Sequence, residues 1–370
     1  MKKTSYHWED LGITAQLSEF STPDAASEFH AILHVDARQE LFVPQLERLY
    51  AAEERLSTVL PAGTKAVMKR YFLSDATNQV PFMKKDDCAV SFIQQQPLDG
   101  SKIAVWIYLV NGMTVRTLED GTVEAAHDGI RHLWKMGMVS TENDSFTQTK
   151  NVLEDYEKCL DNEGLTLEKN CLRTWFFVRD VDTQYHGLVK ARRENFEAQK
   201  LTSDTHYIAS TGIQGLPADP KAIIQLGAYA VDGLKDGQIQ HLYASSHLNP
   251  TYEYGVTFER GTAVDYADRK HVIISGTASI DNKGQVLHKG DIDKQTRRMW
   301  ENVEMLLEEG GATYDDVAQI VVYLRDVADY EHVDRLFKAK FPDTPYVITY
   351  APVCRPEWLV EMECWAIVEK

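Results

Sequence analysis

The sequence contains one segment twice. QTKNVLEDYEKCLDNEGLT runs from 148 to 166, QTRRMWENVEMLLEEGGAT runs from 295 to 313, and the two align without a gap. In both copies the apolar residues recur at spacings of three and four, and a glycine follows the last of them. This pattern predicts an amphipathic helix that ends at the glycine. A chain that repeats an element in this way is expected to fold as repeated units.

The repeat extends beyond this helix in both directions. Three further pairs of blocks match: 132–140 with 271–279, 172–181 with 319–327, and 222–231 with 358–367. The offsets change only between blocks, and β-branched and aromatic runs within the blocks predict strands. A second amphipathic helix follows the 172–181 and 319–327 blocks. The sequence therefore predicts an α+β fold of tandem units, each a mixed sheet with two helices on one face.

The N-terminal part has the same order of predicted elements. A helix is expected at 44–60, and strands are expected at 64–73, 88–96 and 101–110. We found no residue-level alignment with the other copies, so this part is expected to be a degenerate third copy. The predicted domains are 1–118, 119–232 and 233–370.

Charge and composition limit the classes of function. The net charge of −17 and the lack of a Lys/Arg run argue against nucleic acid as a partner. No apolar stretch approaches the roughly 18 residues of a spanning helix, and no signal peptide is apparent. The five cysteines form no CxxC pair, and no histidine cluster has ligand spacing. We expect a cytoplasmic protein that uses no metal or organic cofactor and does not bind membranes.

The copies differ in their last strand. The second copy has Glu361 and Glu363 where the first has Gln225 and Gly227. Strand alternation places both glutamates on one face, between apolar neighbours. Desolvation raises the pKa of a carboxyl, and a raised pKa suits a general acid at neutral pH. Glu361 is the candidate acid, and the alternative is a solvent-facing strand carboxylate.

The C-terminal copy resembles the RidA/YjgF (endoribonuclease L-PSP) family. The resemblance rests on HVIISGTASIDNKGQ, GDI-x-x-QTR, ENVEMLLEEGGATYDDV, VVYLRDVADY and LVEMECWAIV. Proteins of that family have a chorismate-mutase-like fold and form trimers with active sites between subunits. A chain with several such units is expected to build a pseudo-trimer within itself, so a monomer is favoured and a homo-oligomer is the alternative.

From about residue 130 onward the chain is similar to the chorismatase branch of that superfamily. The points of similarity are RTW (173–175), Y-x-x-L-V-x-x-R (185–192), TGIQG (211–215), NPTYEYGVTFER (249–260), SGTAS (275–279) and VCRPEWLVEME (353–363). Chorismatases protonate the enol ether of chorismate and release pyruvate, giving a hydroxybenzoate or a dihydrodiol. The resemblance implies this function for the chain, with Glu361 as the acid.

A dicarboxylate substrate also requires cationic partners, and arginine fills this role best. The candidates for substrate binding are Arg173, Arg192, Arg260, Arg355, Tyr185, Tyr254 and Cys354. Each arginine could instead be a surface charge, and each tyrosine could serve packing alone. Arg192 stands where the other copy has Phe337, so its charge is expected to point inward and to need a partner.

Cys354 has two interpretations. The neighbouring Arg355 would favour a thiolate, and the resemblance associates a cysteine here with the 3-hydroxybenzoate-forming subtype. The alternative is a small buried residue.

Two other functions stay open at this point. One is a RidA-like imine or enamine deaminase or another small-molecule hydrolase, although the arginine that the deaminases carry after the proline of the penultimate strand is missing from Thr344–Ile348. The other is a non-catalytic metabolite-binding protein. The ribonuclease activity suggested by the family's older name fits poorly with the acidic charge.

Overall fold

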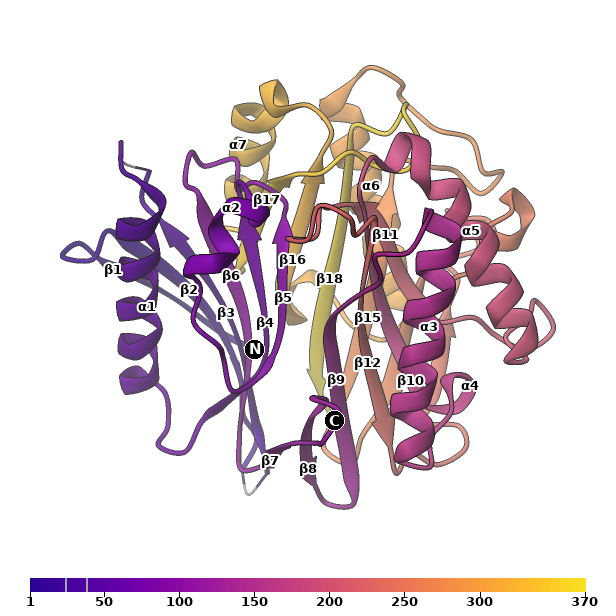
Figure 1. Cartoon of the computed structure of the whole chain (residues 1–370), viewed down its shortest axis with the longest axis horizontal. Helices are drawn as coiled ribbons and strands as arrows, with labels where there is room; N and C mark the ends of the chain where they lie inside the picture. Colours follow the sequence, from indigo (N-terminus) through magenta and orange to yellow (C-terminus); the bar gives the residue numbers. More distant parts are fainter. Residues whose placement is uncertain (24, 38) are drawn as a thin grey trace.

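The computed structural model describes residues 1–370 apart from Asp24, Arg38 and the side chain of Tyr254. Its strands form three six-stranded sheets, and the strand order is the same in each (Figure 1). The orders are β1-β2-β3-β6-β4-β5, β7-β8-β9-β12-β10-β11 and β13-β14-β15-β18-β16-β17. We call these sheets with their helices the first, second and third units. The prediction of tandem α+β units is confirmed, and the N-terminal part is a complete unit.

The first unit contains β1 (Lys2–Trp8), β2 (Ile13–Phe20), β3 (Ser27–Val35), α1 (Phe42–Val59), β4 (Lys65–Leu73), α2 (Ala76–Gln79), η1 (Val80–Phe82), β5 (Ala89–Gln94) and β6 (Ile103–Asn111). Its first helix and its last three strands lie where the sequence predicts them. The second helix of the unit is reduced to α2 and η1, which explains why this copy is hard to align.

The second unit contains β7 (Thr114–Thr117), β8 (Val123–His127), β9 (Ile130–Val139), α3 (Ser145–Asn162), α4 (Leu167–Asn170), β10 (Cys171–Val178), α5 (Val181–Ala198), β11 (Ala209–Gln214) and β12 (Ile224–Asp232). Strand β7 precedes the boundary expected after residue 118, yet it pairs with β8 in the second sheet.

The third unit contains β13 (Ile239–Leu242), η2 (Thr251–Tyr254), β14 (Gly261–Asp265), β15 (Arg269–Ala278), α6 (Ile292–Glu309), η3 (Tyr314–Asp316), β16 (Val317–Leu324), η4 (Val327–Asp329), α7 (Tyr330–Lys340), β17 (Tyr346–Tyr350) and β18 (Val360–Glu369). In every unit one strand pair is parallel, namely β4 with β5, β10 with β11 and β16 with β17, so each sheet is mixed.

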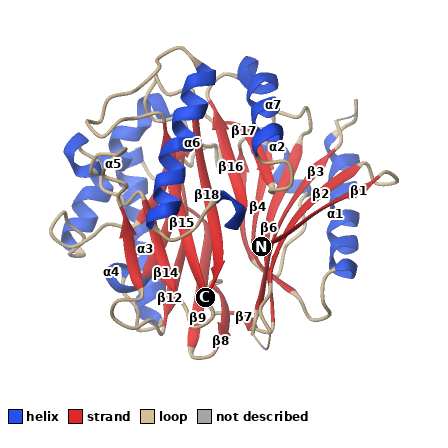
Figure 2. Cartoon of the chain, turned by 180° about the vertical axis from the view of Figure 1, so that it is seen from behind, coloured by secondary structure: helices blue, strands red, loops and turns tan. Residues whose placement is uncertain are grey.

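Helices cover the outer face of each sheet, and the inner faces meet (Figures 1 and 2). Along β6, Ile103, Val105 and Ile107 pack under α1 in a cluster whose buried residues all belong to the first unit. The alternating Trp106 and Tyr108 belong to a cluster that contains residues of all three units. Both faces of the central strands are buried, which explains their nearly continuous apolar sequence.

Equivalent positions of the three units meet in this shared interior. The register pairs Arg70 with Trp106, Trp175 with Gly227, and Val321 with Glu363, each three residues from the corresponding end of the ladder. The three units therefore surround an approximate threefold axis but place different residues on it.

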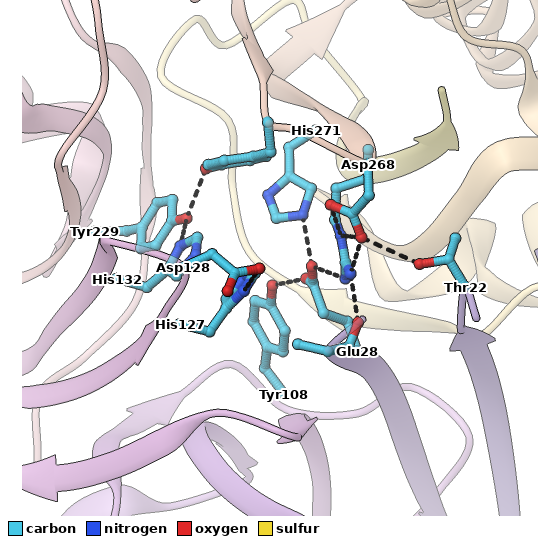
Figure 3. A network of polar contacts seen from close by, with 12 residues as sticks. Thr22, Glu28, Tyr108, His127, Asp128, His132, Tyr229, Asp268 and His271 are labelled. Carbon is cyan, nitrogen blue, oxygen red and sulfur yellow. Dashed lines mark hydrogen bonds and ion pairs between the residues drawn. The ribbon is translucent and has the colours of Figure 1, made fainter. Parts of the chain in front are cut away.

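A buried polar network ties the first unit to the third elsewhere in this interior (Figure 3). The Glu28 carboxylate accepts hydrogen bonds from Tyr108, from Arg269 Nη1 at 2.7 Å and from His271 Nε2 at 3.0 Å. The charges of His271 and Arg269 outweigh burial and hold the pKa of Glu28 well below its usual range. This network is an internal ion pair between units, since Glu28 and Arg269 are both buried.

Among the residues that the structure describes, we find no helix with both the length and the apolar character needed to cross a membrane.

Candidate active site

A cavity of about 530 Å³ lies between the second and third units. Helix α5 and strand β11 form one wall. Strands β15 and β18, the segment before β14 and the loop between β17 and β18 form the other. We call this cavity the active cleft. It brings together Glu361, Tyr185, Arg192, Arg260, Cys354 and Arg355, which are six of the eight site residues expected from the sequence.

Glu361 lies in the wall of the active cleft near the start of β18, opposite Ala278 and Tyr323. Only 5% of the residue is exposed. Burial raises the pKa of its carboxyl to about 8, the charge of Glu363 adds to this effect, and Arg173 and Arg260 oppose it. The carboxyl therefore holds a proton at neutral pH while facing a cavity, as a general acid must.

Gly276 makes room for this carboxyl. A Cβ atom at residue 276 would lie 2.2 Å from Glu361 Oε1 and 2.9 Å from its Cδ. No real Cβ approaches another atom so closely, so a side chain at residue 276 would displace the Glu361 carboxyl from this position. The glycine of the SGTAS segment is thus needed for the position of the acid.

Glu363 is buried next to Glu361 on β18, and both of its carboxylate oxygens accept hydrogen bonds. Its Oε1 accepts from Arg70 Nη1 at 3.0 Å and from Trp175 Nε1 at 2.9 Å, and its Oε2 accepts from Arg173 Nη2 at 2.7 Å and from Thr211 Oγ1 at 2.5 Å. Burial alone would raise the pKa of Glu363, but the charges of Arg173 and Arg70 and the hydrogen bonds outweigh it and keep the pKa low. Glu363 is therefore ionised.

Four guanidinium groups line the active cleft, those of Arg192, Arg193, Arg260 and Arg355. Arg192 of α5 donates from Nε to Thr257 Oγ1 at 3.3 Å and lies 5.8 Å from the ring of Phe258. Arg260 donates to the carbonyl oxygen of Asn249 at 3.0 Å. Arg355 lies over the ring of Trp358 at 4.7 Å. Arg192 is 1% exposed, which confirms that its charge points inward.

Arg173 and Tyr254 are the two expected site residues that are not among the six described in the lining of the active cleft. Arg173 lies one layer deeper, where it is 1% exposed and contacts Glu363 instead of lining the cavity. It therefore acts on Glu361 only through its charge. The side chain of Tyr254 lies outside the described residues.

Tyr185 and Cys354 face one another in the cleft and share a hydrogen bond. Burial raises the pKa of the Cys354 thiol to about 12, the charge of Glu361 adds to the rise, and Arg355 opposes it only weakly. Of the two interpretations left open by the sequence, the raised pKa favours the buried thiol, because the penalty of burial exceeds the attraction of the guanidinium. Cys354 is a neutral thiol in the cleft wall.

The equivalent clefts of the other units lack the acid. Between the first and third units a cavity of about 370 Å³ remains, but Ala104 occupies the position of Glu361. We call this cavity the second cleft. At the third interface Gln225 occupies that position and donates to Ser91 Oγ at 2.6 Å, with both residues buried. One of the three equivalent positions thus carries a carboxyl.

Two residues of this constellation escaped the sequence analysis. Arg70 was missed because the first unit gave no alignment, although a charge within the apolar strand VMKRYFL signals a buried partner. Thr211 belongs to the TGIQG segment but was not singled out. Among the described residues no group of three His, Cys, Asp or Glu side chains could hold a metal ion.

Comparison with known proteins agrees with this architecture. Residues 262–368 match the family described as Endoribonuclease L-PSP. A RutC family protein of Pyrococcus abyssi is 33% identical over 100 residues, which are 26% of this chain and 79% of that protein. The 3-aminoacrylate deaminase RutC of Acinetobacter baylyi is 31% identical over 94 residues, which are 25% of this chain and 74% of that protein.

A crystal structure of a chorismatase resembles most of the chain. Its TM-score is 0.64 at 17% sequence identity, and the match covers 81% of this chain and 92% of the chorismatase. The fold and the site between its units define a tandem protein in which small RidA-like units surround one interior. The chain belongs to the RidA/YjgF superfamily (endoribonuclease L-PSP), and its overall fold is shared with a chorismatase.

Proposed function

We propose that the chain is a chorismatase-type enzyme that acts in the cleft between the second and third units. The observation that carries the proposal is the protonated, buried carboxyl of Glu361 in the wall of a cavity lined by four arginines. A cavity of this volume falls within the range of small-molecule sites. The whole-chain fold shared with a chorismatase supports the choice of substrate.

In the proposed reaction Glu361 transfers its proton to the methylene carbon of the enolpyruvyl ether. The former double bond supplies the electron pair for the new C–H bond, and an oxocarbenium ion results. Water adds to the cationic carbon and returns a proton to the Glu361 carboxylate. The hemiketal then breaks its bond to the ring oxygen, which leaves with a proton, so that pyruvate and a dihydrodiol are released. Attack by a ring hydroxyl instead of water would lead toward a hydroxybenzoate.

The arginines are assigned to the two carboxylates of the substrate. Arg192 and Arg260 flank the ring of Phe258, at 5.8 and 5.6 Å, and both are buried, so their charges act in a low-dielectric surrounding. Arg355 comes from the loop before β18. Such fixed cations bind carboxylates strongly and also stabilise a carboxylate beside the developing cation.

The test is release of pyruvate from chorismate by the purified chain. We expect turnover by the wild type and a loss of about a hundredfold or more in Glu361→Gln, because the amide cannot donate this proton. Asp334→Asn in the second cleft is the matched control and should retain full turnover. Absence of turnover in the wild type, or full turnover in Glu361→Gln, would contradict the proposal, and chorismate binding without turnover would instead indicate a metabolite-binding protein.

A second candidate is deamination of an imine or enamine. It is favoured by the similarity of the third unit to the 3-aminoacrylate deaminase RutC. Against it, Thr344–Ile348 contains no arginine, so the carboxylate clamp expected from the resemblance is missing. Ammonia release from enzymatically generated 2-aminoacrylate or 3-aminoacrylate, without pyruvate release from chorismate, would identify this activity.

A further inference from the structure

No described residue of the first unit lines the active cleft, yet the unit places one charged side chain against the strand that carries Glu361. Arg70 of β4 is 0% exposed, and its Nη1 lies 3.0 Å from Glu363 Oε1. Three rings surround its guanidinium, Trp106 at 5.2 Å, Trp175 at 5.0 Å and Phe177 at 5.0 Å. A cation so far from water requires its carboxylate partner to be ionised.

Glu363 is held in the ionised form from two units at once. Arg70 comes from the first unit, and Arg173, Trp175 and Thr211 come from the second. All four groups donate hydrogen bonds to the carboxylate, and two of them are cations. Hydrogen bonds and opposite charges both favour the charged form of a carboxyl.

Glu361 and Glu363 lie on the same face of β18, two residues apart, so their Cα atoms are separated by about 7 Å. Thr211 connects them more directly, because its hydroxyl donates to Glu363 and accepts the N–H of Gly276, the residue against which Glu361 packs. When two neighbouring carboxyls share a dry interior, the one with the stronger donors ionises and the other retains its proton.

We propose that Glu363, fixed as a carboxylate by Arg70 and Arg173, is a positioning residue that keeps the Glu361 carboxyl protonated. The first unit then has a role in the reaction, since Arg70 sets the charge balance behind the acid without touching the substrate. This assignment rests on the proposed function for the use made of the proton. The protonation itself can be measured without any substrate.

The charges predict opposite shifts for two substitutions. Glu363→Gln removes a negative charge, so Glu361 should lose its proton at a lower pH, and the alkaline limb of kcat/KM against pH should move down by about one unit or more. Arg70→Gln removes a positive charge while Arg173 and Thr211 still hold Glu363 as a carboxylate, so the same limb should move up. The double variant Arg70→Gln/Glu363→Gln restores the net charge and should return the limb close to its wild-type position.

A structural role for the pair would not produce this pattern, because lost packing lowers activity at every pH alike. Glu28→Gln is the matched control, since Glu28 is a buried carboxylate that also links two units and pairs with an arginine (Figure 3). It should reduce stability and leave the limb in place. Should Glu363→Gln fail to fold, Arg70→Gln and the double variant still decide the sign.

Infrared titration separates this inference from the proposed function. The C=O stretch of a protonated carboxyl that is present in the wild type and absent in Glu361→Gln reports on residue 361 alone, and its midpoint is expected near pH 8. Opposite displacement of this midpoint in the two single variants supports the assignment even if chorismate is not the substrate. An unmoved midpoint in both single variants would overturn it.

Discussion

At the scale of the residue, the burial that raises the pKa of Glu361 also destabilises the folded chain at neutral pH. Glu361 ionises freely in the unfolded chain, near its ordinary pKa of 4.5, but its pKa is raised to about 8 in the folded protein. Between these values the folded state binds one proton more than the unfolded state, so stability falls as pH rises. A buried carboxyl of this kind therefore lowers the stability of the folded chain at neutral pH.

We therefore expect Glu361→Gln to be more stable than the wild type. The amide has no charge to desolvate, so the difference should be small near pH 4.5 and reach about 3 kcal/mol at pH 7. Urea denaturation of both proteins across this range measures it. Equal stability at pH 7, or a difference that shrinks as pH rises, would show that Glu361 is not protonated in the folded state.

At the scale of the element, the active cleft differs from the second cleft by small residues in one strand. Strand β11 presents Ser210 and Gly212 to the active cleft, and β17 presents Tyr346 and Ile348 at the equivalent positions of the second cleft. The same topology thus gives a cavity of about 530 Å³ in one place and one of about 370 Å³ in the other.

Gly212→Ile should close the active cleft. A Cβ at residue 212 would lie 2.9 Å from Tyr185 Cε2, and the added branches extend into the cavity. We expect turnover to fall by about a hundredfold or more with the fold retained. The matched substitution in the second cleft, Ile348→Val, should leave turnover unchanged and lower stability by about 1 kcal/mol. Isothermal titration and pyruvate release check both, and normal turnover in Gly212→Ile would show that the substrate binds elsewhere.

The elements were largely predictable from the sequence, and the contacts between units were not. Helical periodicity in 295–309 and apolar runs such as 101–110 reflect burial of whole faces, so they survive in any arrangement of the units. The asymmetry of Glu361 and Gln225 was also visible, because it needs only an alignment of two copies. The contact between Arg70 and Glu363 depends on which inner faces of the sheets pack together. Sequence periodicity does not predict this contact, because it reports only which face of each element is buried.

At the scale of the whole molecule, three units close around one interior. A single apolar cluster includes Trp106, Trp134 and Trp365, one from each unit, so the inner face of every sheet is already covered. The chain achieves this burial by folding as one polypeptide.

We expect the chain to be a monomer in solution. Light scattering should give a mass of about 42 kDa, that of one chain, at micromolar concentration. Because the three units share one cluster, thermal unfolding should also proceed in one transition. A trimeric mass, or separate transitions for separate units, would show that the units do not complete one another within the chain.

The different residues on the approximate threefold axis have a consequence for the evolution of such sites. In an assembly of identical subunits, every side chain near the axis appears three times, so one glutamate brings two more and their mutual repulsion limits what can be placed there. When the units are fused into one polypeptide, a residue near the axis in one unit is no longer repeated in the other two. Arg70, Trp175 and Val321 can then diverge independently, and the centre of the molecule can hold one arginine paired with one glutamate.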